Sequence, residues 1–147
     1  MTGGSPKYVF RDTDAFEVMR ALARRSGLEE GGNDPFDDAH GCFLGDELIG
    51  CAGLKMSDGV FTVENLAVDE RFRDEGIGTI LVRMIEQDAQ RRGATGIWAL
   101  ARAPEFFKKL GYAEADPPAG GKPSMLGCLS CPQYKKSCNP ALMFKAL

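Results

Sequence analysis

The chain has 147 residues, of which 44% are hydrophobic and 27% are charged, and its formal net charge at pH 7 is −3. This length suits one domain with a core of its own and is too short for two. The ordinary balance of apolar and charged residues gives no indication of a nucleic-acid or membrane partner. We therefore expect one domain over residues 1–147, with residues 113–147 as a less typical, cysteine-containing C-terminal segment.

The sequence also carries no sign of a targeting or membrane segment. The N-terminus has no basic stretch followed by an apolar core, and no apolar run approaches the roughly 20 residues of a membrane span. A cytoplasmic location is expected. The cysteines number five, and Cys42 and Cys51 lie in apolar segments where small buried thiols pack well, so a disulfide framework is not expected.

The first half of the chain contains short apolar runs and one stretch with helical spacing. The strands expected from these runs lie at residues 7–11, 41–44, 48–56 and 60–68. A helix capped by Asp12 or Thr13 follows the first strand, and an acidic, glycine-rich loop spans residues 26–38. Tight turns separate the last three strands, which are expected to pair antiparallel.

The turn after the fourth strand has the composition of a phosphate-binding loop, and it opens a helix expected over residues 79–92. Gly76 and Gly78 have no Cβ, so the backbone there can approach a ligand closely. The free N–H groups of the first helical turn direct positive partial charge at an anion, and Arg73 adds a full charge. The turn is not the dinucleotide fingerprint, which needs a third glycine after Gly78.

The rest of the chain predicts a crossover and a short second helix. A strand at residues 95–101 follows the long helix, so a right-handed crossover sets it parallel to residues 60–68 and opens a cleft. Pro104 begins a helix over residues 105–110, and Gly111 ends it. Residues 113–123 are expected to form a loop, and residues 141–147 a last strand.

Two motifs in this order resemble the signatures of the GNAT superfamily of acetyl-CoA-dependent N-acetyltransferases. Arg73-Asp-Glu-Gly76-Ile-Gly78, after Leu66-Ala67-Val68, resembles the family's Arg/Gln-x-x-Gly-x-Gly/Ala loop. Phe106-Phe107-Lys-Lys-Leu110-Gly111-Tyr112 is similar to its second signature, in the form seen in N-acetylglutamate synthases and short amino-acid acetyltransferases. The resemblance covers roughly residues 8–112. It implies an α/β (α+β) fold with a mixed, mostly antiparallel sheet flanked by helices, whose splayed parallel strands bind coenzyme A.

The resemblance also implies acetyl-CoA as cosubstrate. The pyrophosphate would bind at the loop and the pantetheine along the strand edge, where an N–H polarises the thioester oxygen and supplies roughly 3 kcal/mol. The residues expected to bind the cofactor are Leu66, Ala67, Val68, Arg73, Asp74, Glu75, Gly76, Ile77, Gly78, Thr79 and Phe107. The carboxylates of Asp74 and Glu75 would repel phosphates if they turned inward, so they are expected to face solvent.

Glu64 is the candidate general base. It lies two residues from Leu66, which places both on the same face of a regular strand, although it could also face solvent or pair with an arginine. In several family members the glutamate stands two residues earlier, where this chain has Thr62. Phe107 stands where many members have a tyrosine that returns a proton to the thiolate, so water, another group or no acid must serve here.

The acceptor is expected to be a primary amine of a small molecule or amino acid, attacked directly in a ternary complex. Residues 26–54 contain seven Asp or Glu and no Lys or Arg, which disfavours an anion there unless the loop is merely solvated. The alternative is a GNAT-like domain that binds coenzyme A as a sensor or scaffold without transferring the acyl group, and Phe107 keeps it open. Whether the chain forms a homodimer is also left open.

The remaining motif is Cys128-x-x-Cys131-x6-Cys138. A structural zinc takes four ligands, and His40, the single histidine, is far away in the sequence. No metal site is therefore predicted, and free or redox-active thiols are expected instead. His40 itself is expected to be a surface or strand histidine.

Overall fold

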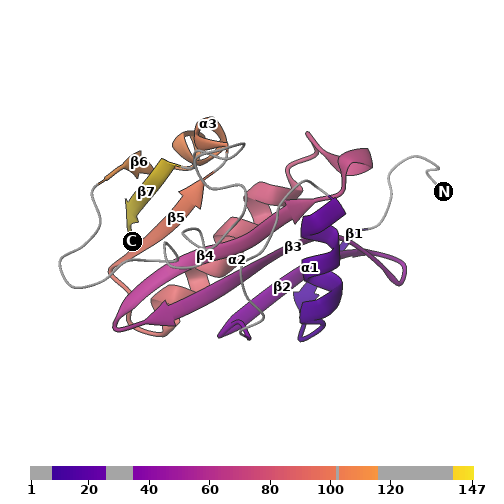
Figure 1. Cartoon of the computed structure of the whole chain (residues 1–147), viewed down its shortest axis with the longest axis horizontal. Helices are drawn as coiled ribbons and strands as arrows, with labels where there is room; N and C mark the ends of the chain where they lie inside the picture. Colours follow the sequence, from indigo (N-terminus) through magenta and orange to yellow (C-terminus); the bar gives the residue numbers. More distant parts are fainter. Residues whose placement is uncertain (1–7, 26–34, 102, 116–140) are drawn as a thin grey trace.

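The computed structural model describes residues 8–25, 35–101, 103–115 and 141–147. In these ranges one seven-stranded sheet has the order β1-β2-β3-β4-β5-β7-β6. Helix α1 covers one face of the sheet and helix α2 the other (Figure 1). The elements are β1 (Tyr8–Asp12), α1 (Phe16–Arg25), β2 (Asp38–Leu44), β3 (Glu47–Ser57), β4 (Val60–Val68), η1 (Glu70–Phe72), α2 (Ile77–Arg91), β5 (Gly96–Ala101), α3 (Pro104–Lys109), β6 (Ala113–Glu114) and β7 (Ala141–Ala146).

The predicted fold class is confirmed. Strands β1 to β4 pair in sequence order, each antiparallel to the next. β4 and β5 form the parallel pair that the crossover through α2 predicts. β7 then pairs antiparallel with both β5 and β6, so the chain's last strand lies inside the sheet. None of the helices in the described ranges has the length and apolarity needed to span a membrane.

Helix α2 begins two residues earlier than predicted, at Ile77 rather than Thr79. The side chain of Ile77 is buried in the core, so tertiary packing extends the helix back over Gly78. Gly50 on β3 allows this close approach, because a Cβ there would lie 2.9 Å from Cγ2 of Ile77. The helix start is therefore determined by the sheet beneath it as well as by local propensity.

Two strand predictions also needed correction. β2 begins at Asp38, which was expected to be the end of a loop, because its backbone pairs with Leu54 of β3. Residues 113 and 114, predicted as loop, form β6 by pairing with Phe144 and Met143 of β7. Both extensions depend on partners distant in the sequence, which local composition does not reveal.

The two faces of the sheet bury separate cores. The core under α1 contains Met19, Leu22, Ala23, Phe36, Ala39, Phe43, Leu48, Cys51 and Ala67. The larger core under α2 and α3 includes Ile49, Leu54, Val63, Ile77, Leu81, Ile85, Ile97, Phe107 and Met143. Cys42 and Cys51 are buried free thiols, as predicted, and burial raises the pKa of Cys42 to about 11. Cys128, Cys131 and Cys138 lie outside the described residues.

A buried charge ties α2 to the C-terminal strand. The hydroxyl of Tyr112 donates to Glu86 over 2.8 Å, and Lys145 Nζ lies 3.1 Å from the other carboxylate oxygen. Burial and the hydrogen bond to Glu86 raise the pKa of Tyr112 far above its ordinary value. Tyr112, the last residue of the second motif, is therefore hydrogen-bonded to α2 through its hydroxyl, and its ring packs in the core.

Removing the partner charge should leave Glu86 buried and uncompensated. We expect Lys145→Met to lower the free energy of unfolding by about 3 kcal/mol, measured by urea denaturation. The control is Lys108→Met, which breaks the exposed pair with Glu105 and should cost less than about 0.5 kcal/mol. Equal losses in the two variants would show that the Glu86 cluster adds nothing beyond a surface ion pair.

Candidate functional site

A β-bulge interrupts β4 at Asn65. Along the β3–β4 ladder Gly53 pairs with Glu64 and Cys51 pairs with Ala67, so Ala52 alone opposes two residues of β4. Asn65 has a φ of 56°, in the left-handed region that a non-glycine residue rarely adopts. The extra residue makes β4 bend at this point.

Hydrogen bonds from both neighbouring elements hold the bulge. The Asn65 side-chain amide donates to the carbonyl of Met19 on α1 over 3.2 Å. The Cys51 thiol donates to the Asn65 carbonyl over 3.4 Å. Asparagine tolerates the left-handed conformation better than most residues, and these bonds offset its cost of roughly 1–2 kcal/mol. The bulge is therefore built by α1, β3 and β4 together.

The bulge overturns the predicted placement of Glu64 and Leu66 on one face. Glu64 opposes Gly53, whose face is covered by Phe36, and so it points to the α1 side. Leu66 packs against the core under α2. The prediction assumed strict alternation, and the extra residue at Asn65 shifts that alternation by one. Glu64 shares its face with Thr62, two residues earlier, as expected.

Beyond the bulge, β4 and β5 separate. Their parallel pairing is confined to Thr62 with Trp98 and Val63 with Ala99. Among the described residues, β5 does not pair with Leu66–Val68, so β5 leaves this edge of β4 without a partner strand. An unpaired strand edge presents a row of N–H and C=O groups. These are the groups that an extended molecule carrying amides could bind.

The N-terminus of α2 follows this edge after η1 and a short loop. Gly76 is the N-cap residue, with a φ of 81° and no side-chain cap, and the first turn carries no acidic residue. In an α-helix that starts at Ile77, the first N–H groups, including those of Gly78 and Thr79, have no partner within the helix. The Arg73 Nε donates to the carbonyl of Val68 over 3.3 Å. Strand end, arginine and helix N-terminus thus form one continuous surface.

Gly78 has a packing role in addition to the predicted ligand access. A Cβ at Gly78 would lie 3.2 Å from Cζ of Phe106 on α3. Phe106 is therefore the ring beside the helix start, a position that its place in the second motif could have indicated. Phe107 lies in the core, edge-on to Phe106 and Tyr112, so its predicted contact with the cofactor stays a prediction.

The turn between strand and helix is shaped by charged side chains. The carboxylate of Asp69 accepts from the backbone and guanidinium of Arg71, and these hydrogen bonds lower the pKa of Asp69 to about 2. Arg71 also pairs with Glu47 over 2.5 Å. Asp74 has a φ of 64°, and the carboxylate of Glu75 accepts a hydrogen bond from Tyr8. Glu75 is thus exposed, as expected, and its carboxylate is hydrogen-bonded to Tyr8.

An aromatic pair lies beside Thr62 on the α1 face, which Thr62 shares with Glu64. The pair consists of Trp98 and Phe144, whose ring centroids are 4.8 Å apart. Trp98 lies beside Thr62 in the parallel ladder, and its neighbours Ile97 and Ala99 face the opposite core. The strict alternation of β5 indicated this orientation, and the sequence reasoning overlooked it.

The acidic region between residues 26 and 54 is partly structural. The carboxylate of Asp38 pairs with Arg92 over 2.7 Å, and Asp37 accepts from the backbone of Met56. Glu47 pairs with Arg71, as described above. Residues 26–34 lie outside the described ranges. Asp38 and Glu47 are thus paired with arginines, which weakens the argument that this region attracts a cationic acceptor.

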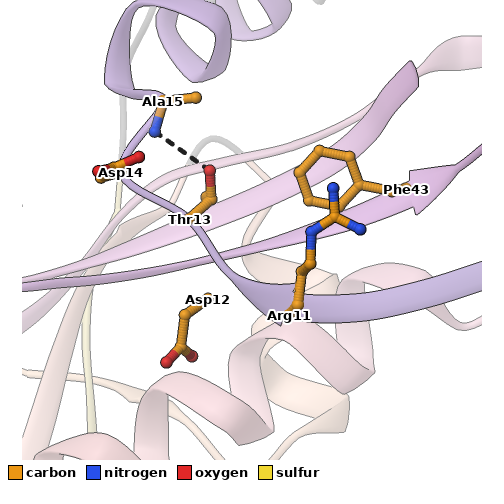
Figure 2. Close-up of a pocket in the computed structure, with 6 residues that line it drawn as sticks. All are labelled: Arg11, Asp12, Thr13, Asp14, Ala15 and Phe43. Carbon is orange, nitrogen blue, oxygen red and sulfur yellow. Dashed lines mark hydrogen bonds between the residues drawn. The ribbon is translucent and has the colours of Figure 1, made fainter. Parts of the chain in front are cut away.

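A separate depression of about 620 Å³ lies at the turn between β1 and α1. Figure 2 shows Arg11 against the ring of Phe43, and Thr13, which accepts from the backbone of Ala15. Strands β2 and β3 separate this depression from the open edge of β4. Its position makes it a poor candidate for the chemistry expected at that edge.

His40 is a buried strand residue beside this depression. Its ring nitrogens lie against the carboxylates of Asp12, at 3.0 Å, and Asp88. Burial lowers the pKa of His40, while the nearby acidic residues act in the opposite direction. Among the described residues no group of three or more metal-binding side chains comes together. The prediction for the three C-terminal cysteines lies outside those residues and stays a prediction.

The comparison with known families decides the assignment. Residues 9–112 match the model of the acetyltransferase (GNAT) family. The chain belongs to this family. The match covers both motifs and the strand between them, and it confirms the resemblance found in the sequence.

Relatives and solved structures agree with the assignment. An uncharacterised N-acetyltransferase of Chlorobaculum tepidum is 29% identical over 102 residues, which are 69% of this chain and 65% of that protein. The Bacillus subtilis N-acetyltransferase YjcF is 33% identical over 70 residues, 46% of this chain and 50% of YjcF. This GNAT chain thus spans about half to two thirds of these relatives.

Two solved structures share the fold. Rv2747 of Mycobacterium tuberculosis, in complex with CoA, has a TM-score of 0.73 at 18% identity and covers 95% of this chain and 99% of its own. N-acetylglutamate synthase of Neisseria gonorrhoeae, with coenzyme A and N-acetyl-glutamate, has a TM-score of 0.71 at 19% identity. The match covers 98% of this chain and 36% of the synthase chain. At these identities the likeness shows the fold alone.

The bulge can be tested by changing Asn65. We expect Asn65→Val to lower the free energy of unfolding by roughly 3 kcal/mol, because a β-branched residue is strained at this φ and loses the amide bond to Met19. Asn65→Gly, the control, keeps the backbone conformation and should cost roughly 1 kcal/mol. Chemical denaturation measures both losses. Identical losses would show that the left-handed backbone conformation of residue 65 does not account for the destabilisation by valine.

Proposed function

We propose that the protein transfers the acetyl group of acetyl-CoA to a primary amine of a small molecule or amino acid. The acceptor nitrogen attacks the thioester directly in a ternary complex. The observation that carries this proposal is the end of β4–β5 pairing after Val63 and Ala99, together with the N-terminus of α2, which packs beside the end of β4: a Cβ at Gly78 would lie 3.8 Å from Cγ2 of Val68. Membership of the acetyltransferase family supports the same chemistry.

The cofactor would bind along this continuous surface. Its pyrophosphate would take the N–H groups at the start of α2, with Gly76 and Gly78 leaving the backbone accessible and Arg73 supplying charge. The pantetheine amides would pair with the backbone of Leu66–Val68 in place of a strand partner. A backbone N–H there can polarise the thioester oxygen, which is worth roughly 3 kcal/mol in the transition state.

The acceptor would approach from the α1 face. Glu64 and Thr62 lie on that face, and Trp98 and Phe144 form an aromatic surface beside them. An ammonium group is attracted both by a carboxylate and by aromatic faces, so this surface suits an amine that arrives protonated. The N-acetyl-glutamate complex of the gonococcal synthase is consistent with an amino acid as acceptor.

Glu64 would act as the general base, directly or through water. An α-amino group with a pKa near 8 is mostly protonated at pH 7 and must lose a proton before it attacks. The nitrogen then forms the amide bond to the acetyl carbon, and the C–S bond breaks. The thiolate of coenzyme A is a moderate leaving group and can take its proton from water, so the buried, apolar Phe107 does not prevent turnover.

The decisive experiment detects coenzyme A formed from acetyl-CoA, separated by chromatography, with a panel of amino acids, polyamines and aminoglycosides. Release that depends on one amine class, with the acetylated amine identified by mass, supports the proposal. Tight acetyl-CoA binding with no amine-dependent release would favour a coenzyme A sensor or scaffold instead. A cytoplasmic location and a homodimer remain predictions, and light scattering on the purified chain measures the second.

Arg73 should contribute to cofactor affinity through the phosphates. We expect Arg73→Ala to raise the Kd for coenzyme A about tenfold, since a hydrogen bond to a charged group is worth about 1.5–3 kcal/mol. Isothermal titration calorimetry measures this, and pantetheine, which lacks the phosphates, should be unaffected. The control is Arg11→Ala at the separate depression, which should change neither affinity. An unchanged Kd in a folded Arg73 variant contradicts the proposed phosphate site.

The pH–rate profile tests Glu64. We expect Glu64→Gln to lower kcat about 100-fold near pH 6.5, and to lower it less as pH rises past about 8, where neutral amine is abundant. Affinity for acetyl-CoA should barely change. Thr62→Val tests the other position that the family resemblance offers. A Glu64→Gln profile parallel to that of the parent protein would show that Glu64 is not the base.

A further inference from the structure

One hydrogen bond joins the first strand to the loop at the start of α2. The hydroxyl of Tyr8 on β1 donates to Oε1 of Glu75 over 2.5 Å, although the two residues are 67 positions apart. The ring of Tyr8 lies edge-on to Phe72 of η1, with centroids 6.2 Å apart. Both rings pack against the larger core, under α2 and α3, and this packing holds the hydroxyl in place.

Glu75 occupies a position where a free carboxylate would interfere with an anion. It immediately precedes Gly76, the N-cap of α2, and the first turn of that helix carries no acidic residue. A Cβ added at Gly76 would meet no atom within 4 Å, so the space around the N-cap is open. A carboxylate is attracted to a helix N-terminus by the same field that attracts a phosphate. The two would therefore compete.

We propose that Tyr8 is a positioning residue for the pyrophosphate site, which holds the carboxylate of Glu75 away from the N-terminus of α2 and so keeps that terminus free for coenzyme A. This inference rests on the proposed function. The hydrogen bond to Glu75 raises the pKa of Tyr8 to about 12, so the hydroxyl remains a donor at neutral pH. In this proposal Tyr8 acts through Glu75, to which it is hydrogen-bonded.

The proposal predicts a loss of affinity that depends on charge. In Tyr8→Phe the carboxylate is released, and its repulsion of a doubly charged pyrophosphate at about 8 Å should raise the Kd for coenzyme A about fivefold. In Glu75→Gln the negative charge is gone, so affinity should rise slightly. In the double variant Tyr8→Phe/Glu75→Gln, affinity should match Glu75→Gln, because no charge remains to be held away.

The test is calorimetry of these three variants and the parent, with coenzyme A and with pantetheine, at low salt and near 1 M salt. Glu47→Gln is the matched control, because it removes one nearby exposed carboxylate that pairs with Arg71 and not with Tyr8. The loss in Tyr8→Phe should shrink at high salt, where the Debye length is about 3 Å, and should be absent with pantetheine. Thermal melting checks that each variant is folded.

Three results would overturn the inference. If the double variant binds coenzyme A as weakly as Tyr8→Phe, or if the loss persists at high salt, the bond acts only through the shape of the loop. If Tyr8→Phe binds as tightly as the parent, the tyrosine does not position Glu75 for binding. In each case Arg73→Ala still reports on the phosphate site, so failure of this inference and failure of the proposed function are distinguishable.

Discussion

The bulge at Asn65 is the constraint on which the candidate site depends. One extra residue, held in a left-handed conformation by bonds to α1 and β3, bends β4 just beyond Val63, the last residue of β4 that pairs with β5. The same residue turns Glu64 to the α1 face and Leu66 to the α2 core. In a regular strand the side chains of Glu64 and Leu66 would share one face. The left-handed conformation of Asn65 costs roughly 1–2 kcal/mol, which its hydrogen bonds offset.

The second half of the site is placed by packing on the other side of the sheet. Gly50 lets Ile77 approach β3 closely, and Gly78 accommodates the ring of Phe106. Both contacts determine where α2 begins and therefore where its free N–H groups lie relative to the end of β4. The glycines of the loop thus serve packing and ligand access together. These two roles are compatible, because a helix start that packs tightly on one side stays accessible on the other.

Charged residues in this protein mostly serve the framework. Glu86 is buried between Tyr112 and Lys145, His40 lies between Asp12 and Asp88, and these pairs connect helices to strands. Asp38 and Glu47 pair with arginines from α2's end and η1, so part of the acidity in this region serves the framework. The proposal that the acceptor binds on the α1 face therefore rests on the positions of Glu64, Trp98 and Phe144 and not on the net charge of the chain.

The sequence by itself determined the family, the fold class and the approximate position of most strands and helices. It could do so because the phosphate loop, the second motif and the periodicity of the strands are local patterns of residue type. Tertiary structure decided the face on which Glu64 lies, the first residue of α2, the existence of β6 and the bond between Tyr8 and Glu75. Each of these depends on a partner remote in the chain. A left-handed residue, a buried helix start or a hydrogen bond across 67 positions is stabilised by packing that no short window of sequence contains.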